Sequence, residues 1–86
     1  MIIKKDLIKR EIAGETILIP VGKTVYDSHG LFAVNEVGSF LWDRIPDADS
    51  DEDLLQAVLE EYDVTETVAR QDIAEFLDKL REMNII

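Results

Sequence analysis

The residue types that most often carry chemistry are sparse in this chain of 86 residues. It has no cysteine, so it offers neither a thiolate nucleophile nor a cysteine zinc site. Its one histidine, His29, lies among turn residues, and we interpret it as a surface-loop residue. Glu60 and Glu61 are neighbours on a predicted helix, where adjacent side chains do not face each other. With no nucleophile–base pair, phosphate-binding glycine loop or redox motif, we predict that the chain is not an enzyme and needs no cofactor or metal ion.

An acidic segment from Asp47 to Asp51 is similar to the opening of an EF-hand calcium loop. Glu52, however, stands where the sharp turn of that loop needs glycine, and Val58 stands where a bidentate glutamate should follow. Because carboxylates stabilise the N-terminus of a helix, we interpret the segment as a solvated acidic cap for the helix that follows.

The net charge of −10 is distributed unevenly along the chain. Residues 1–42 carry five basic and five acidic side chains, whereas residues 43–86 carry four basic and fourteen acidic ones. This distribution argues against binding to nucleic acid or to an anionic membrane surface, both of which reward clustered Lys and Arg. No apolar run approaches the roughly 20 residues that span a bilayer, and the first residues lack the features of a signal peptide. We therefore expect a cytoplasmic protein.

Three short strands are predicted to precede any helix. Leu7–Ile12 and Glu15–Ile19 form a hairpin around Ala13-Gly14, where the glycine supplies a positive φ. Residues 21–30 contain turn signals and are expected to form a connecting loop. The apolar run Leu31–Val34 is the third strand.

Three helices follow, and each begins at a side chain that can accept an otherwise unpaired N–H. Asn35 caps the first, which ends near Pro46; Ser50 caps the second; Thr65 caps the third, which ends near Asn84. Apolar residues recur at helical spacing in all three: Val37, Phe40, Leu41 and Ile45; Leu54, Leu55, Val58, Leu59 and Tyr62; Ala69, Ile73, Phe76, Leu77, Leu80 and Met83. The predicted fold class is α+β and winged-helix-like, with an N-terminal three-stranded antiparallel sheet followed by a three-helix bundle. Residues 1–86 are expected to form one domain.

The junction between the third strand and the first helix is predicted to organise this domain. Gly38, in the first helical turn, lets another element approach closely because it has no Cβ. Trp42 follows four residues later on the same side, and we expect it to cover Gly38 as a partly buried anchor.

Several segments together resemble the PqqD-like family, named for pyrroloquinoline quinone biosynthesis protein D. They are Arg10–Glu15, Asn35-Glu36-Val37-Gly38 with Trp42, Glu60–Val64, and Phe76-Leu77 with Leu80. The resemblance extends from Leu7 to Ile86, and the Asn-Glu-x-Gly-x-x-x-Trp segment is its most specific part. The chain differs from the family in the polar residue Lys9 of its first strand and in its acidic Asp47–Asp53 connection.

The resemblance implies a non-catalytic peptide chaperone, also known as a RiPP recognition element. Such proteins bind the leader segment of a ribosomally made precursor peptide and present it to a modifying enzyme, often a radical SAM protein. The leader adds as a strand beside the third strand and lies against the third helix. The residues that this implies for peptide binding are Leu31, Phe32, Ala33, Val34, Val68, Asp72, Glu75 and Lys79.

Two points remain open at the level of the sequence. The opposite flank of the third helix, with Arg70, Ala74 and Arg81, could border the groove instead; we prefer the first flank because Val68 adds an apolar contact. The other point is the function: a winged-helix DNA-binding regulator is the alternative, although it would need a basic third helix. The strand Leu31–Val34 could also simply pack the core or form an edge-to-edge contact, so we expect a monomer or a weak dimer.

Overall fold

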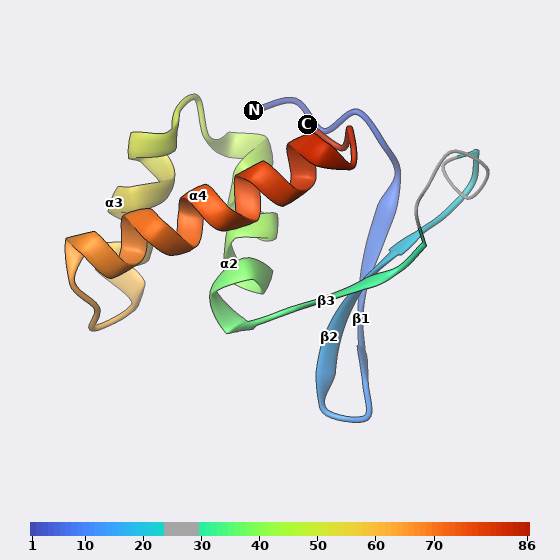
Figure 1. Ribbon diagram of the computed structural model, residues 1–86, viewed down its shortest axis with the longest axis horizontal. Helices are drawn as coiled ribbons and strands as arrows, with labels where there is room; N and C mark the ends of the chain where they lie inside the picture. Colours follow the sequence, from blue (N-terminus) through green and yellow to red (C-terminus); the bar gives the residue numbers. More distant parts are fainter. Residues whose placement is uncertain (24–29) are drawn as a thin grey trace.

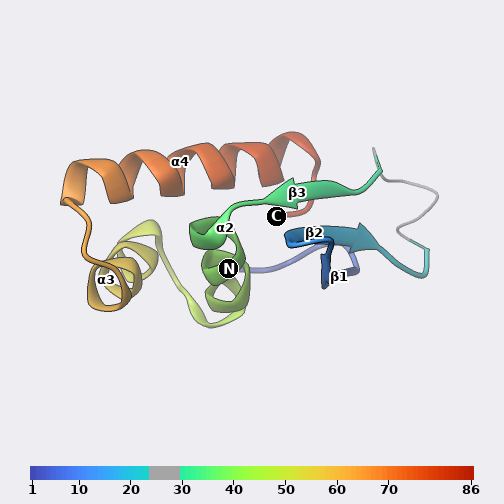
Figure 2. The same cartoon turned by 90° about the horizontal axis from the view of Figure 1, so that it is seen from below.

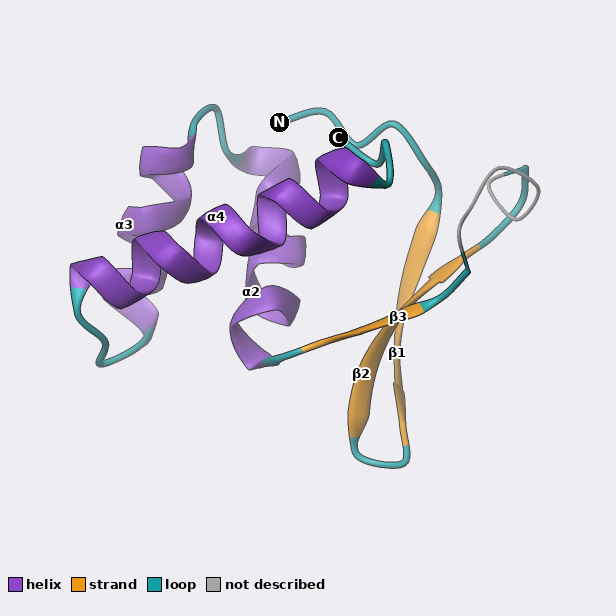
Figure 3. Ribbon diagram, viewed as in Figure 1, coloured by secondary structure: helices purple, strands orange, loops and turns teal. Residues whose placement is uncertain are grey.

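The computed structural model describes residues 1–23 and 30–86, in which a small sheet is joined to a group of helices (Figures 1 and 3). The sheet has three antiparallel strands, β1 (Leu7–Ile12), β2 (Glu15–Pro20) and β3 (Phe32–Val34), in the order β1-β2-β3. The helices are α2 (Glu36–Arg44), α3 (Asp51–Glu61) and α4 (Glu66–Glu82). The predicted α+β, winged-helix-like class is thus confirmed. Most of the predicted loop at 21–30 and the whole of His29 lie within residues 24–29, outside the described residues.

A two-residue turn joins β1 to β2. Ala13 and Gly14 both adopt positive φ, 52° and 82°, as the hairpin turn that follows the twist of the strands requires. We expected the positive φ at Gly14 only. The pairing of Ile12 with Glu15 across this turn sets the register of the whole β1–β2 ladder, down to Leu7 opposite Pro20.

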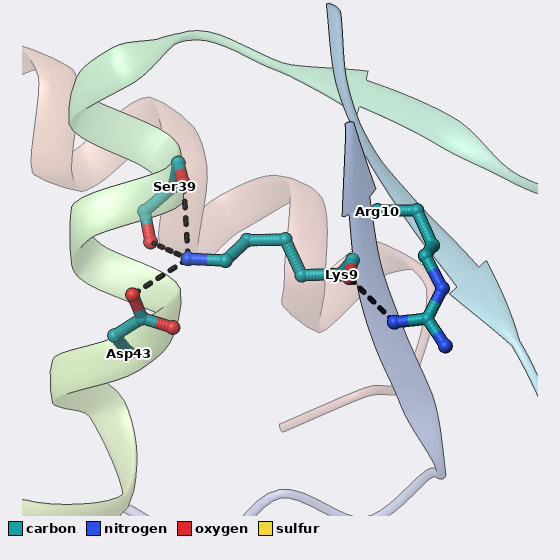
Figure 4. A network of polar contacts seen from close by, with 4 residues as sticks. All are labelled: Lys9, Arg10, Ser39 and Asp43. Atoms are coloured by element: carbon teal, nitrogen blue, oxygen red, sulfur yellow. Dashed lines mark hydrogen bonds and ion pairs between the residues drawn. The ribbon is translucent and has the colours of Figure 1, made fainter. Parts of the chain in front are cut away.

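One polar side chain of β1 links the hairpin to α2. Lys9 pairs with the buried Leu18 in the sheet, and its Nζ reaches across to α2 (Figure 4). There it donates to Asp43 Oδ2 at 2.6 Å and to Ser39 Oγ at 3.1 Å. The Lys9 side chain is 28% exposed, so its aliphatic part lies against the domain while its charge stays hydrated and paired. The unusual lysine of the first strand therefore adds a polar link between the sheet and α2.

The predicted caps are present at the start of each helix. Asn35 Oδ1 accepts from the Gly38 amide at 2.7 Å, Ser50 Oγ from Asp53 at 3.4 Å, and Thr65 Oγ1 from Val68 at 3.3 Å. A short 3-10 helix, Ile45–Asp47, follows α2. The acidic segment after it serves the capping role that we expected, because Asp53 also accepts from the amide of Asp49 at 2.9 Å.

The core lies where the inner face of the sheet meets the three helices. Its largest fully buried side chains come from β2, from the junction of α2 with the 3-10 helix, from α3, from α4 and from the C-terminal return. They are Leu18, Leu41, Ile45, Leu54, Leu55, Val58, Leu77, Leu80 and Ile85. Most of the apolar faces predicted from helical spacing are therefore the faces that are buried, with Val37, Phe40, Leu59, Tyr62 and Met83 packed at their margins.

At Gly38, residues of β3 and α4 pack closely against α2. A Cβ on this residue would lie 3.2 Å from Val34 Cβ and 3.3 Å from Phe76 Cδ1. We expected Trp42 to cover this position; the nearest atoms belong instead to β3, the cap residue Asn35 and α4. Trp42 itself is buried, at 9% exposure, within the core.

The chain ends fold back together. Asn84, at φ 58°, ends the helical conformation as predicted, and the amide of Ile85 then donates to Leu80 O at 2.8 Å. Ile85 is buried, and its carbonyl accepts from the Lys4 amide at 2.6 Å, so the N- and C-terminal segments lie side by side (Figure 1). Across the described residues, no helix is long and apolar enough to cross a membrane.

Replacing Trp42 by Ala is expected to lower the free energy of unfolding by about 3–5 kcal/mol, because it removes the largest side chain of the core and leaves a cavity. Chemical denaturation followed by circular dichroism measures this change. Ile12→Ala is the matched control: Ile12 is 49% exposed, so its truncation should change stability by less than about 1 kcal/mol. Equal losses for both variants would contradict the placement of Trp42 in the core.

Candidate functional site

The outer edge of β3 is one of the two open edges of the sheet, the other being that of β1. Because β2 is the central strand, one side of β3 carries no strand among the described residues. A strand edge of this kind presents N–H and C=O groups that can pair with another chain. Which residues of β3 present them depends on how the hydrogen bonds alternate along the ladder.

The alternation can be followed from the far end of the hairpin. The amide of Val21 donates to Asp6 O at 3.0 Å, one step beyond the last pair of β1 and β2. Every second pair of an antiparallel ladder is hydrogen-bonded, so after Val21 the bonded residues of β2 are Ile19 and Ile17. Ile17 therefore directs its N–H and C=O toward β1. Its two neighbours on β2 then direct theirs toward β3, where they pair with the first and last residues of that strand. The middle residue, Ala33, consequently directs its N–H and C=O out of the sheet.

Helix α4 runs alongside this edge and forms a groove with it. Figure 2 shows α4 and β3 along the same side of the molecule, with β2 and β1 farther from the helix. The β3–α4 groove has a volume of about 230 Å³. Its lining residues are Ala33, Val34, Asn35, Gly38, Asp72, Glu75, Phe76 and Lys79.

The groove combines an apolar floor with charged walls. Lys79 Nζ lies 4.8 Å from the centre of the Phe32 ring, a cation–π distance, at the beginning of β3. Glu75 accepts a long hydrogen bond of 3.5 Å from Gln71. In the part of the chain that the structure describes, neither Glu75 nor Asp72 nor Lys79 forms an ion pair. These charges therefore remain available to a ligand.

The opposite flank of α4 lies beside α3 and not beside β3, and its charged side chains form ion pairs. Arg70 pairs with Glu52 at 2.8 Å and with Glu66 at 3.3 Å, which raises the pKa of its guanidinium, chiefly through the hydrogen bond to Glu52. Arg81 lies 3.9 Å from Asp51. Arg70 also lines, together with Ala74, a small hollow against α3. The flank that the sequence analysis preferred is thus the one that lies beside β3.

The structure brings most of the predicted site residues together. Ala33, Val34, Asp72, Glu75 and Lys79 line the groove. Outside this set, Phe32 contacts Lys79 and packs against the core, so the strand serves both the core and the edge. Leu31, just before β3, and Val68, on the first turn of α4, are 60% and 46% exposed and do not line the groove. Their role in binding stays a prediction.

A second hollow, of about 480 Å³, lies on the other side of the β3–α2 junction, and the sequence analysis missed it. It shares Ala33, Val34 and Asn35 with the groove. Its other lining residues are Gly14, Glu15, Thr16, Glu36, Ser39, Phe40, Asp43 and Tyr62. The Phe40 and Tyr62 rings meet edge to face, with centres 5.4 Å apart. Burial, with the charges of Glu36 and Glu61, raises the pKa of the Tyr62 hydroxyl.

Among the described residues, no group of three or more His, Cys, Asp or Glu side chains is placed to hold a metal ion. The acidic run around Asp51 is used in helix capping and in the contact with Arg81. The chemistry of the site is consequently that of an open strand edge beside a helix with charged side chains.

Comparisons with known proteins give the family of the chain and solved structures with a similar fold. The model of the family described as coenzyme PQQ synthesis protein D (PqqD) matches residues 15–86. TbiB1, solved in complex with the TbiA(beta) leader peptide, has a similar fold: TM-score 0.71 and 24% identity over 99% of this chain and 93% of that one. Lasso peptide synthetase B1, complexed with the leader peptide, is similar with a TM-score of 0.67 and 22% identity over 93% and 88% of the chains. No curated protein sequence matches the chain.

The direction of the main-chain groups on β3 predicts an alternating pattern of amide hydrogen exchange in the free protein. Phe32 and Val34 should exchange at least about tenfold more slowly than Ala33, relative to their intrinsic rates, because only their amides are bonded to β2. NMR-detected exchange measures this pattern. The other edge provides an internal control, since the same alternation protects Arg10 and leaves Glu11 open. Strong protection of Ala33 would contradict a free edge.

Proposed function

The chain belongs to the coenzyme PQQ synthesis protein D (PqqD) family, and on that premise we propose that it is a non-catalytic peptide-binding module. It captures the leader segment of a ribosomally synthesised precursor peptide by strand addition to β3. It then presents the precursor to a modifying enzyme, for example a radical SAM protein.

The observation that carries this proposal is the outward-facing main chain of Ala33 beside the β3–α4 groove. Strand addition obtains its affinity from main-chain hydrogen bonds and its specificity from pockets for alternate side chains. The groove, at about 230 Å³, is several times larger than the share of about 30 Å³ that one water takes in the liquid, so it can receive side chains of an added strand. In both similar structures the protein is in complex with a leader peptide, which supports the same kind of ligand here.

Each predicted residue has a place in this proposal. Leu31, Phe32, Ala33 and Val34 form the edge, and Ala33 supplies the hydrogen bonds. Asp72, Glu75 and Lys79 contact the side chains of the peptide that point toward α4. Leu31 and Val68, exposed beyond the two ends of the groove, add apolar contacts to a leader longer than β3.

The alternative of a DNA-binding regulator gains no support from the helix that would have to enter the major groove. Helix α4 carries the acidic residues Glu66, Asp72, Glu75, Asp78 and Glu82 against the basic residues Arg70, Lys79 and Arg81. Two of its three basic side chains, the arginines, are also paired with carboxylates. Such a surface repels phosphates rather than attracting them.

Ala33→Pro tests the strand edge, because it removes the outward N–H while leaving the ladder to β2 intact. Binding of leader peptides encoded by short reading frames beside the gene, measured by fluorescence anisotropy, should weaken by about 1–3 kcal/mol. Circular dichroism should report an unchanged fold.

Glu11→Pro is the matched control for this experiment. Glu11 also directs its N–H outward, but from the edge of β1, so this variant removes the same kind of group from the wrong edge. It should bind like the wild type. Unchanged affinity for Ala33→Pro, or an equal loss for both variants, would remove the β3 edge from the binding mechanism.

A further inference from the structure

The charges of the β3–α4 groove are arranged in a fixed order along β3. Lys79 lies over Phe32, at the beginning of the strand. Phe76, one turn earlier on α4, lies against Gly38, beyond the end of the strand. Helix α4 therefore runs antiparallel to β3, and Glu75 and Asp72 follow toward the Val34 end. The groove is positive where β3 begins and negative where it ends.

Among the described residues, the charges of the groove have no partner of opposite sign, unlike the two arginines of the same helix. Both arginines of the helix are within 4.0 Å of carboxylates on the flank facing α3 or along the helix itself. The carboxylates of Asp72 and Glu75 and the ammonium of Lys79 make no such contact within the described chain. Lys79 is not paired even with Glu75, four residues before it, although this spacing favours an ion pair. Both the negative and the positive side chains of the groove are thus available to pair with charged groups of a ligand.

The pairing of β3 determines which peptide residues meet these charges. A strand added at the free edge would form its hydrogen-bonded pair with Ala33. Its residues opposite Phe32 and Val34 would then point to the same side as those two side chains, which is the side packed toward α4 and the core. These two peptide positions are separated by two residues, about 7 Å along a strand. Glu75 and Lys79 are separated by four residues of helix, about 6 Å, so the two spacings match.

Resting on the function proposed above, we propose that the groove selects leader peptides by the order of their charges. The bound segment carries a Lys or Arg two positions before an Asp or Glu. The basic residue lies near Glu75 and Asp72, and the acidic residue lies near Lys79. We take the added strand to be antiparallel to β3, because all described strand pairs of this sheet are antiparallel. An antiparallel peptide passes Val34 before it reaches Phe32, so its basic residue comes first.

Selection from a displayed library of random 12-residue peptides tests this order even while the natural precursor is unidentified. Peptides enriched on the wild-type protein should carry the basic-before-acidic pattern. For synthetic versions, exchanging the two charges should weaken binding by about three- to tenfold at low salt, and high salt should reduce the difference.

The protein variant that tests the order is Asp72→Lys with Glu75→Lys and Lys79→Glu, which reverses every charge of the groove. It should enrich the opposite order. The three substitutions together raise the net charge by 2, so Glu60→Lys, at an exposed site on α3, is a control with the same change. That control should select the wild-type pattern. Lys79→Glu alone provides a milder variant, which should lose only the preference for the acidic residue.

The outcomes separate the two proposals. Enriched peptides that bind Ala33→Pro more weakly, but that show no charge order or the acidic-before-basic order, overturn this inference. They leave the proposal of strand addition intact. The same selected sequences on the wild type and on the charge-reversed variant also overturn it. If no enriched peptide depends on Ala33, the proposed function is wrong and this inference is wrong with it.

Discussion

The close approach at Gly38 is the constraint on which the rest of the structure depends. Val34 and Phe76 both reach the space that a side chain at this position would occupy. This contact sets α4 directly beside the end of β3, and the helix then follows the strand back to Lys79 and Phe32. A Cβ at this position would fit only if Val34 or Phe76 moved slightly away, so the glycine favours the close packing of β3 and α4. The Asn35 cap, which bonds to the amide of the same Gly38, fixes the turn that brings strand and helix together.

A free strand edge is a liability in most proteins, because it can pair with any extended chain. The surroundings of the β3 edge restrict which extended chains can pair with it. Helix α4 covers one side of the approach, so a pairing chain must place alternate side chains in the groove. The Lys9 contacts with Asp43 and Ser39 link the hairpin to α2 on the other side of the sheet's junction with the helices. In this account the main chain supplies the affinity, and the unpaired charges of α4 supply the selectivity.

Much of this structure could be predicted from local rules. Caps at Asn35, Ser50 and Thr65, together with the helical spacing of apolar residues, indicated three helices and the faces that they bury. Features that depend on tertiary contacts could not be predicted in this way. Gly38 marked a close approach, yet helical spacing within α2 pointed to Trp42, whereas the real neighbours come from elements distant in sequence. The hollow around Phe40 and Tyr62 and the pairing of Lys9 were missed for the same reason.

The central claim is that an extended peptide adds to β3 as an antiparallel strand, and intermolecular NOEs in a labelled complex test it most directly. Because Ala33 forms the hydrogen-bonded pair, the close Hα–Hα contacts of the non-bonded pairs must involve Phe32 and Val34. The account predicts such NOEs from both residues to peptide positions two apart, with contacts from Lys79 and Glu75 to the side chains at those positions. NOEs confined to the hollow around Tyr62 or to the outer face of the hairpin, with Phe32 and Val34 silent, would contradict it.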